Sequence, residues 1–406
     1  MSNQIDVSLI YNNYTNEKID NDKSIIIKKY NNVKKNANYT TVKYNKNHLL
    51  EDEYNTLGLA RSIVFNNNNQ VLSYSPPKSL NYQDMSFTQD FDSDHIVALE
   101  FIDGTMINLF WDNQIDDWEI STKSCVTGNI AFYIQKDSKT FRNMFLEACN
   151  DINFDFENLP KTSSDNNQLC YSFVLQHVSN RIVVPYKENK IYLIYVFEIK
   201  QTDSNLTVCD YNDERLTDYF KATNVKFPEI YKEKVYFKDI ESLKQTYCSD
   251  KTPYHIQGVV LYNKTNMMRA KFRNANYEAI RKIRGNQPKI QYRYLSLYKE
   301  GNVDHYLKYY PEDKNEFYIF KNELFFYTKH LFMNYVGCFI KKEKPVQDFK
   351  YQYRNHMISL HELYIGQLKP LNKYITLEIV INYIKELPTP RLMYVLNYDK
   401  KYHEKI

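Results

Sequence analysis

The chain has 406 residues, six cysteines and a formal net charge of +4. This length allows two or three domains with a large buried core, so stability needs no disulfide framework. The cysteines lie far apart without Cys-x-x-Cys or Cys/His spacing, which argues against a zinc module and is typical of a reducing compartment. The longest apolar stretch, residues 191–199, is too short to span a bilayer, and the first residues lack the apolar core of a signal peptide. We expect a soluble cytoplasmic protein without a membrane partner.

Basic residues gather in two segments of this nearly neutral chain. The first holds Lys23, Lys28, Lys29, Lys34, Lys35, Lys43 and Lys46, and the second holds Arg269, Lys271, Arg273, Arg281, Lys282, Arg284, Lys289 and Arg293. Such clustering predicts a localised face that binds a polyanion. For the first segment, solvated lysines on an ordinary surface are an equal alternative.

The first 130 residues predict strands after a polar start. Residues 1–40 are rich in Asn, Lys and Asp, and we expect a partly ordered segment with one or two edge strands. Residues 59–65 are typical of a buried strand, and a turn leads to a second strand that Pro76-Pro77 ends. Asp103-Gly104 between apolar residues predicts a β-hairpin over residues 97–109.

Alternation continues to predict strands as far as residue 272. Strands are expected at 118–124, 171–176 and 191–199 and in a hairpin over 255–272, with helices at 139–149 and twice within 210–250. These elements predict a largely antiparallel β domain with peripheral helices over residues 41–285.

Beyond Arg273 the pattern becomes helical. Helices are predicted at 276–284, 316–340, 356–368, 377–387 and from 389 onward, with Gly285 ending the first. Thr376 and Thr389, which precedes Pro390, are the expected N-caps. Apolar residues nearly all round 316–340 favour a central bundle helix. The predicted fold class is therefore α+β, with an all-α C-terminal domain over residues 286–406.

Short motifs in a fixed order carry a family resemblance. They are LGLARSIVF (57–65), VALEFIDGTMINL (97–109), EISTKSCVTGN (119–129), YSFVLQHVSNRIVV (171–184), IQGVVLY (256–262) and RAK (269–271). Together they resemble the phage-type RNA ligase 1 family, and this implies a nucleotidyltransferase-like β core. NTLG (55–58), SPPKS (75–79) and KKEKP (341–345) also look similar to uncharacterised proteins of large nucleocytoplasmic DNA viruses, which implies a viral protein of the host cytoplasm or viral factory.

The resemblance implies a degenerate catalytic site. Phe101 stands where the family has the lysine that forms lysyl-AMP, and it has no lone pair for that attack. Val174 replaces a ribose-binding glutamate, and Gln257 replaces a metal-binding glutamate, losing the charge that a hard cation requires. Of the two closing lysines, one is Arg269 and one is retained as Lys271. The other positions that match the family are Arg61, Asp103, Gly104, Lys123, Asn180 and Arg181.

These substitutions remove the nucleophile and the ribose- and metal-binding carboxylates, and they retain the cations. We therefore expect no catalytic residue, metal or cofactor, and a site that binds a nucleotide or RNA through phosphate contacts. Its expected residues are Arg61, Phe101, Asp103, Gly104, Lys123, Asn180, Arg181, Gln257, Arg269 and Lys271. The ring of Phe101 could stack on a base, and the favoured alternative is that Phe101 and Val174 fill the vacated pocket as core.

Three functions remain open. The first is an inactive ligase-like protein that binds RNA, an RNA end or cap, or a nucleotide and serves as a binding or scaffold subunit. The second is an active RNA ligase or nucleotidyltransferase, using ATP and magnesium, with Lys123 as a relocated nucleophile. The third is a structural or protein-recruiting role in which residues 316–340 and 351–364 of the helical domain contact a partner.

Overall fold

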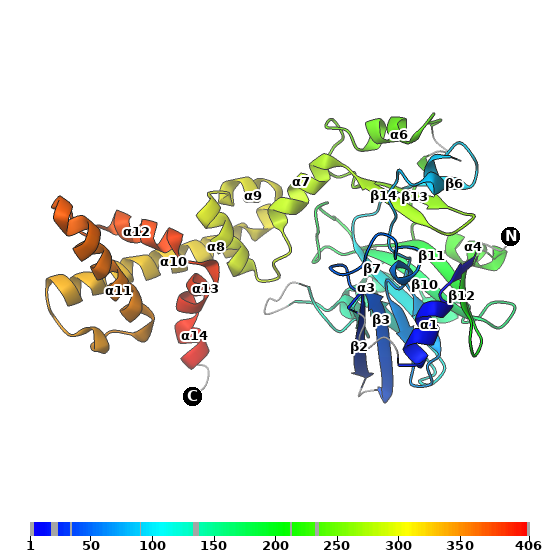
Figure 1. Cartoon of the computed structure of the whole chain (residues 1–406), viewed down its shortest axis with the longest axis horizontal. Coiled ribbons are helices and arrows are strands. Elements are labelled where there is room, and N and C mark those ends of the chain that lie inside the picture. The colour runs from blue at the N-terminus through cyan, green and yellow to red at the C-terminus, as the bar shows by residue number, and fades with distance from the viewer. Residues whose placement is uncertain are drawn as a thin grey trace. The chain divides into compact units, whose positions relative to one another are not determined.

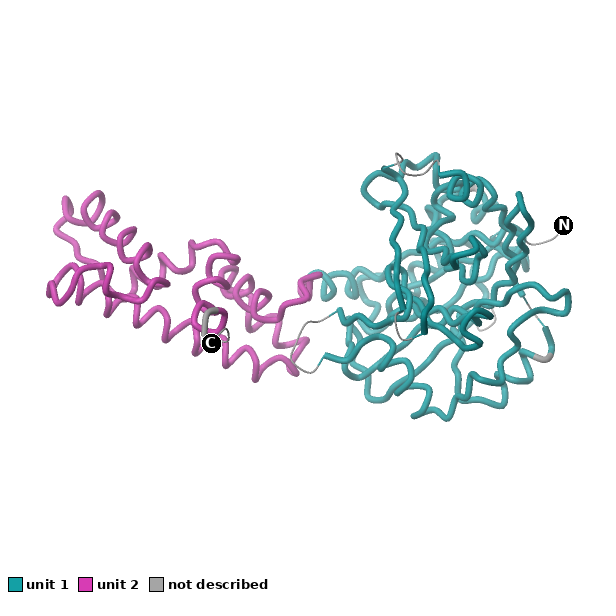
Figure 2. The backbone as a smooth tube through the Cα atoms, turned by 90° about the horizontal axis from the view of Figure 1, so that it is seen from below, with its two compact units in different colours: residues 1–132, 138–282 teal, residues 133–137, 283–406 magenta. Residues whose placement is uncertain are grey.

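The structure is a computed structural model that describes residues 4–17, 23–32, 35–89, 91–132, 138–211, 213–231 and 235–403. It divides into two compact units, the β-rich unit (Met1–Phe132 and Ser138–Lys282) and the helical unit (Ile283–Ile406) (Figure 2). Lys34, expected in the first basic segment, lies outside the described residues.

Three antiparallel sheets form the β-rich unit (Figure 1). The seven-stranded sheet contains, in spatial order, β1 (Gln4–Asp6), β12 (Leu206–Asp210), β11 (Lys190–Gln201), β10 (Gln168–Gln176), β7 (Thr105–Asp112), β8 (Asp117–Thr122) and β9 (Cys125–Val126). The four-stranded sheet contains β2 (Ile25–Asn32), β3 (Ala37–Tyr44), β4 (Ile63–Phe65) and β5 (Val71–Tyr74). The three-stranded sheet contains β14 (Arg269–Arg273), β13 (Gly258–Asn263) and β6 (Ile96–Glu100).

The seven-stranded sheet is buried on both faces. In β7, Ile107 and Leu109 join an apolar core with Phe145 of α3 (Phe141–Asp151). Phe110 points the other way, into the core that includes Phe65 of the four-stranded sheet. The two-residue period of a strand accounts for this division.

Helices flank the strands in the described part of the β-rich unit. They are α1 (Ser8–Thr15), α2 (Met85–Thr88), α3, α4 (Glu214–Lys221), α6 (Ile240–Tyr247) and α7 (Ala275–Arg284), and α7 extends two residues beyond this unit. The predicted helix at 139–149 is confirmed with a shift of two residues, because Thr140 accepts a hydrogen bond from the Asn143 amide and so begins α3. Gly285 follows α7 with φ of 67°, as a C-terminal cap requires.

The predicted hairpin over residues 97–109 is wrong. β6 pairs with β13, whereas β7 pairs with β8 and β10, so the two strands belong to different sheets. Residues 101–104 are a connection between sheets, and the Phe101 amide donates to the Gly258 carbonyl. Pairing with distant strands has overridden the local turn signal of Asp103-Gly104. The strand predicted over 59–65 is also shorter, since it begins only at Ile63 of β4 and a 3-10 turn ends at Leu59.

The helical unit confirms the predicted all-α C-terminal region. Its helices are α8 (Ile290–Glu300), α9 (Val303–Tyr309), α10 (Lys314–Tyr335), α11 (Tyr351–Leu363), α12 (Leu377–Glu386), α13 (Thr389–Leu396) and α14 (Tyr398–His403). Thr376 is the N-cap of α12, as predicted, and accepts from the Ile379 amide. Thr389 is not an N-cap but the first residue of α13, after Pro388. None of the described helices is long and apolar enough to cross a membrane.

The central bundle helix predicted over 316–340 is confirmed as α10, which packs against α8, α11, α12 and α13, but it is not buried on every side. One side of the helix is packed through Phe317, Leu324, Tyr327, Leu331 and Tyr335. The other side exposes a set of apolar residues that we name the α10 outer stripe. It consists of Tyr318, Ile319, Phe325, Phe326 and Met333. The apolar residues of this segment are therefore only partly buried.

Candidate phosphate-binding site

The alternation of β14 places three cations on one face of the three-stranded sheet. Arg269, Lys271 and Arg273 are two residues apart, so their side chains share a face. Ala270 and Phe272, between them, join the apolar core on the opposite face. The strand therefore separates a charged surface from a buried one. A shift of its pairing by one residue would exchange the two faces.

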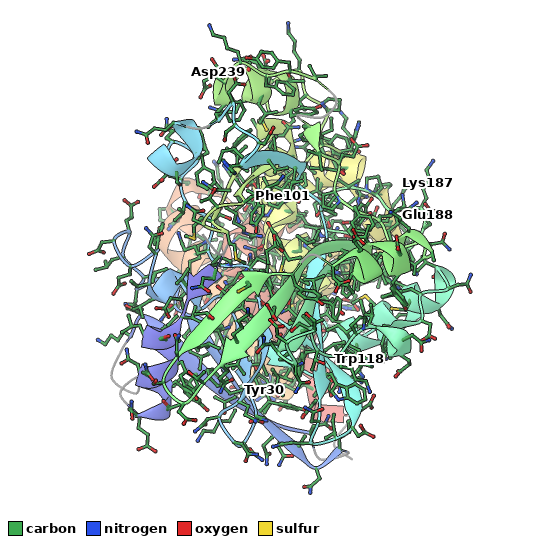
Figure 3. The ribbon with its side chains drawn as sticks, turned by 90° about the vertical axis from the view of Figure 1, so that its right-hand side faces the viewer. Tyr30, Phe101, Trp118, Lys187, Glu188 and Asp239 are labelled. Atoms are coloured by element: carbon green, nitrogen blue, oxygen red, sulfur yellow. The ribbon has the colours of Figure 1, made fainter. Side chains whose placement is uncertain are left out.

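Phe101 belongs to the charged face. Phe101 is labelled in Figure 3. Its ring centroid lies 5.7 Å from the Lys271 Nζ and 5.3 Å from the Arg273 guanidinium carbon. Both distances are within the range of cation–π attraction. Phe101 is half-buried and is in neither apolar core, so the core-filling alternative does not describe it. Val174, by contrast, is buried.

Two more cations reach this face from other parts of the β-rich unit. Arg61 follows the turn Leu57–Leu59, and Lys123 follows β8. The Lys123 Nζ lies 4.7 Å from the centroid of the Tyr44 ring. We name Arg61, Lys123, Arg269, Lys271 and Arg273 the cationic cluster.

Burial and the neighbouring cations lower the pKa values of the lysines in the cationic cluster. The pKa of Lys271 is lowered to about 6, first by burial and then by Arg269, Arg61, Arg273 and Lys123 in that order. Burial and then Arg61 lower the pKa of Lys123 to about 8. The charged groups that lower the pKa of Lys271 are all cations, so a bound anion would reduce the repulsion among them.

Hydrogen-bonding capacity is also unused at the cationic cluster. The Arg269 side chain is 7% exposed, and its Nε is buried with no hydrogen-bond partner among the described residues. The Nε of Arg273 is likewise unpartnered there, although its guanidinium pairs with Glu278 at 3.0 Å. Unsatisfied guanidinium donors beside surplus positive charge are suited to phosphate oxygens.

The donors in this region do not fit a divalent metal. Gln257 offers a buried Oε1 without a partner in the described structure, and it is neutral. Val174 and Phe101 offer no oxygen, while Mg²⁺ is ordinarily held through one or two carboxylates. Among the described residues, no group of three or more His, Cys, Asp and Glu could hold a metal.

Asp103 forms structural hydrogen bonds to the backbone and to a tyrosine. Its carboxylate is buried and accepts from the amides of Val183 and Val184, at 3.2 and 2.9 Å, and from the Tyr277 hydroxyl at 3.1 Å. Burial raises the pKa of Asp103, and these donors oppose that shift. Asp103 thus joins the connection between sheets to the 183–184 segment and to α7.

Three other predicted site residues have similar structural contacts. The Asn180 amide donates to the Thr105 hydroxyl at 3.0 Å, and the Arg181 Nε donates to the Val183 carbonyl at 3.0 Å. Gly104 has no space for a side chain, because a Cβ there would lie 2.5 Å from the Leu175 carbonyl oxygen. Of the ten predicted residues, four therefore have structural contacts and four belong to the cationic cluster. The remaining two are Phe101, whose ring lies beside Lys271, and the neutral Gln257.

Arg273 was missing from the predicted site. It appeared only as one member of the second basic segment, although the pattern Arg-Ala-Lys-Phe-Arg (269–273) carries the signal. A strand places every second residue on one face, so Arg269 and Lys271 on that face bring Arg273 with them.

Comparison with known proteins gives distant structural similarities. No family model and no curated protein match the sequence. A putative ATP-dependent DNA ligase from Aquifex aeolicus is similar at 12% identity and a TM-score of 0.36, over 88% of this chain and 80% of that one. An archaeal ATP-dependent RNA ligase is similar at 10% identity and a TM-score of 0.42, over 74% and 70%. Both scores are low.

Proposed function

We propose that the chain binds the phosphate groups of a nucleotide or an RNA end at the cationic cluster and acts as a nucleic-acid-binding subunit of a degenerate nucleotidyltransferase type. The observation that carries this proposal is the convergence of Arg61, Lys123, Arg269 and Lys271 beside Phe101. Burial and the neighbouring cations lower the pKa of Arg61, Lys123 and Lys271, and a phosphate dianion supplies the missing negative charge.

Covalent nucleotide transfer is not part of the proposal. A lysyl-nucleotide requires an amine in line with the α-phosphorus, and Phe101 occupies the family position of that amine. Lys271 and Lys123 have lowered pKa values that favour a neutral amine. The carboxylates that would hold the metal and the ribose are nevertheless Gln257 and Val174, so the positioning groups are missing.

Incubation with labelled ATP or GTP and Mg²⁺, followed by a denaturing gel, tests this point. We expect no covalent band. A band that disappears in Lys271→Gln or Lys123→Gln would replace the binding proposal with the alternative of a relocated nucleophile.

Filter binding tests phosphate recognition directly. The ligands are one short RNA with a 5′-triphosphate, monophosphate, cap or hydroxyl end, each over a salt series. We expect binding to the phosphorylated ends to fall steeply with salt and to weaken by about tenfold or more in Arg269→Gln/Lys271→Gln. Lys187→Gln/Lys251→Gln removes the same charge at exposed positions and is the matched control. Equal losses in the two double variants would contradict the proposal.

A second candidate function is recruitment of a protein through the helical unit. The α10 outer stripe favours it, because Ile319, Phe326 and Met333 are seven residues apart and each is more than half exposed. That spacing fits an amphipathic helix of a partner packed along α10. Ile319→Ser/Phe326→Ser should abolish capture of such a partner while leaving phosphate binding intact, and unchanged capture would reject this role.

A further inference from the structure

The helical unit contains a cavity that the cationic cluster does not use. It lies between α11 and α13 and has a volume of about 430 Å³. Its lining includes Tyr351, Gln352, His356, Arg391 and Tyr394. A cavity of this size is in the range that small organic ligands occupy.

Two polar groups in the lining are buried without partners. The His356 Nε2 has no hydrogen-bond partner among the described residues, and its side chain is 3% exposed. The Gln352 Oε1 is also unpartnered in the described structure, with its side chain 9% exposed. Buried polar atoms are nearly always hydrogen-bonded, so a ligand that bonds to both would remove an unfavourable feature.

The other ring nitrogen of His356 is already engaged. Nδ1 lies 2.7 Å from the Tyr383 hydroxyl, and this contact orients the ring. Burial and then Arg391 lower the pKa of His356 to about 4, so the imidazole is neutral near pH 7. A neutral ring with one nitrogen engaged can give or accept one hydrogen bond through Nε2.

Arg391 gives the cavity a net positive charge. Its guanidinium has no ion pair among the described residues, and the guanidinium carbon lies 6.0 Å from the centroid of the Tyr394 ring. The aromatic wall is fixed by packing, because Tyr398 stacks on Tyr351 at 5.6 Å and meets Tyr394 edge-on at 5.7 Å. An aromatic wall, two deep polar groups and one cation suit a planar heterocycle that carries an anionic substituent.

We propose that this cavity binds a nucleoside monophosphate unit, with the phosphate on Arg391, the base against Tyr351 and Tyr394, and the base edge bonded to Gln352 and His356. The unit could be a free nucleotide or one residue of an RNA strand, which are two sources of the same chemistry. The inference does not depend on the proposed function, because every residue named here belongs to the helical unit.

Calorimetry with the full-length Arg269→Gln/Lys271→Gln protein separates this cavity from the cationic cluster. The probes are AMP, adenosine, inorganic phosphate and a 5′-phosphorylated tetranucleotide. We expect one AMP per chain, with affinity at least about tenfold above that of adenosine or phosphate. Tighter binding of the tetranucleotide would assign the site to RNA, and tighter binding of AMP would assign it to free nucleotide. Absence of binding by both would overturn the proposal.

Variants of the lining complete the test. Arg391→Gln should lower AMP affinity by about tenfold or more, and Lys373→Gln, which removes an exposed cation of the same unit, should not. Gln352→Leu should lower AMP affinity but not the weak affinity for phosphate, with the folded state verified by thermal melting. AMP affinity unchanged in both Arg391→Gln and Gln352→Leu would also overturn the proposal.

Discussion

At the scale of single residues, the cationic cluster has positively charged side chains but lacks the nucleophile and the carboxylates that nucleotide transfer requires. Phe101 provides a ring flanked by Lys271 and Arg273, and the nearby Gln257 provides an oxygen without charge. Three cations on alternate residues of one strand repel one another, and part of that repulsion appears as the lowered pKa of Lys271. Relief of this repulsion by an anion links binding to protonation.

Phosphate binding should therefore take up a proton. The pKa of Lys271 falls from its ordinary value of 10.5 to about 6, so the free site is mostly neutral there at pH 7.5. A bound phosphate raises this pKa, and the lysine becomes protonated. Calorimetry with tripolyphosphate in buffers of different ionisation enthalpy should show up to about one more proton taken up by the wild type than by Lys271→Gln. Equal uptake by both proteins would contradict this assignment.

The lowered pKa of Lys271 makes stability and phosphate affinity change in opposite directions with pH. Between pH 6 and 10.5 the unfolded chain holds a proton on Lys271 that the folded chain has released. The free energy of unfolding should therefore rise with pH across this window, while phosphate affinity falls. Denaturant titrations of the wild type and Lys271→Gln over this range measure the difference, and parallel curves would show that Lys271 is not the group responsible.

Phe101 should contribute to base recognition rather than to phosphate recognition. Phe101→Leu keeps an apolar side chain but removes the stacking surface, so AMP affinity at the cationic cluster should fall by about tenfold while tripolyphosphate affinity stays the same. The measurement is made in an Arg391→Gln background, which weakens AMP binding in the helical-unit cavity. An equal loss for both ligands would mean that Phe101 only supports the positions of Lys271 and Arg273.

At the scale of elements, the connection between β6 and β7 brings the three-stranded sheet to the seven-stranded one. Asp103 ties this connection to the 183–184 segment and to Tyr277 of α7. Gly104 lets it pass against β10, since a Cβ would also lie 2.6 Å from the Val174 Cγ1. The position of Phe101 on the charged face therefore depends on contacts with segments distant in sequence.

Gly104→Ala should destabilise the β-rich unit by about 2 kcal/mol, because the close atom is a backbone oxygen that cannot move aside easily. Gly58→Ala is the matched control, since its Cβ would meet the closest neighbour at an ordinary 3.5 Å. Chemical denaturation measures both variants. Similar losses in the two would show that the approach at Gly104 is not tight.

At the scale of the whole molecule, each of the two units contains one of the two proposed binding sites. The residues of the cationic cluster lie in the β-rich unit, and the cavity between α11 and α13 lies in the helical unit. Each unit has buried aromatic residues of its own, such as Phe110 and Phe145 in one and Tyr306 and Tyr335 in the other. Separate cores make independent folding of each unit the natural expectation.

A fragment of residues 1–285, which keeps α7 complete, should therefore retain the tripolyphosphate affinity of the full chain. It should lose the AMP binding that depends on Arg391. Circular dichroism verifies folding before calorimetry is done. A folded fragment without tripolyphosphate affinity would show that the helical unit contributes to the first site.

Alternation and helical periodicity in the sequence were sufficient to predict the α+β class, the antiparallel strands, α3 with its apolar face and the helical C-terminal region. These follow from interactions between residues close in the chain, so local patterns contain them. The cations on β14 were also visible, because a strand period of two places Arg269, Lys271 and Arg273 together.

Only the tertiary structure decided three other features. β6 and β7 joined different sheets because strands distant in sequence offered better pairing than a local turn. The outer side of α10 stayed exposed because burial depends on which helices pack against it, and its apolar sequence cannot specify that. Arg61 and Lys123 met Lys271 only through the fold, and their mutual repulsion, which makes the site suited to phosphate, depends on distances that no sequence spacing contains.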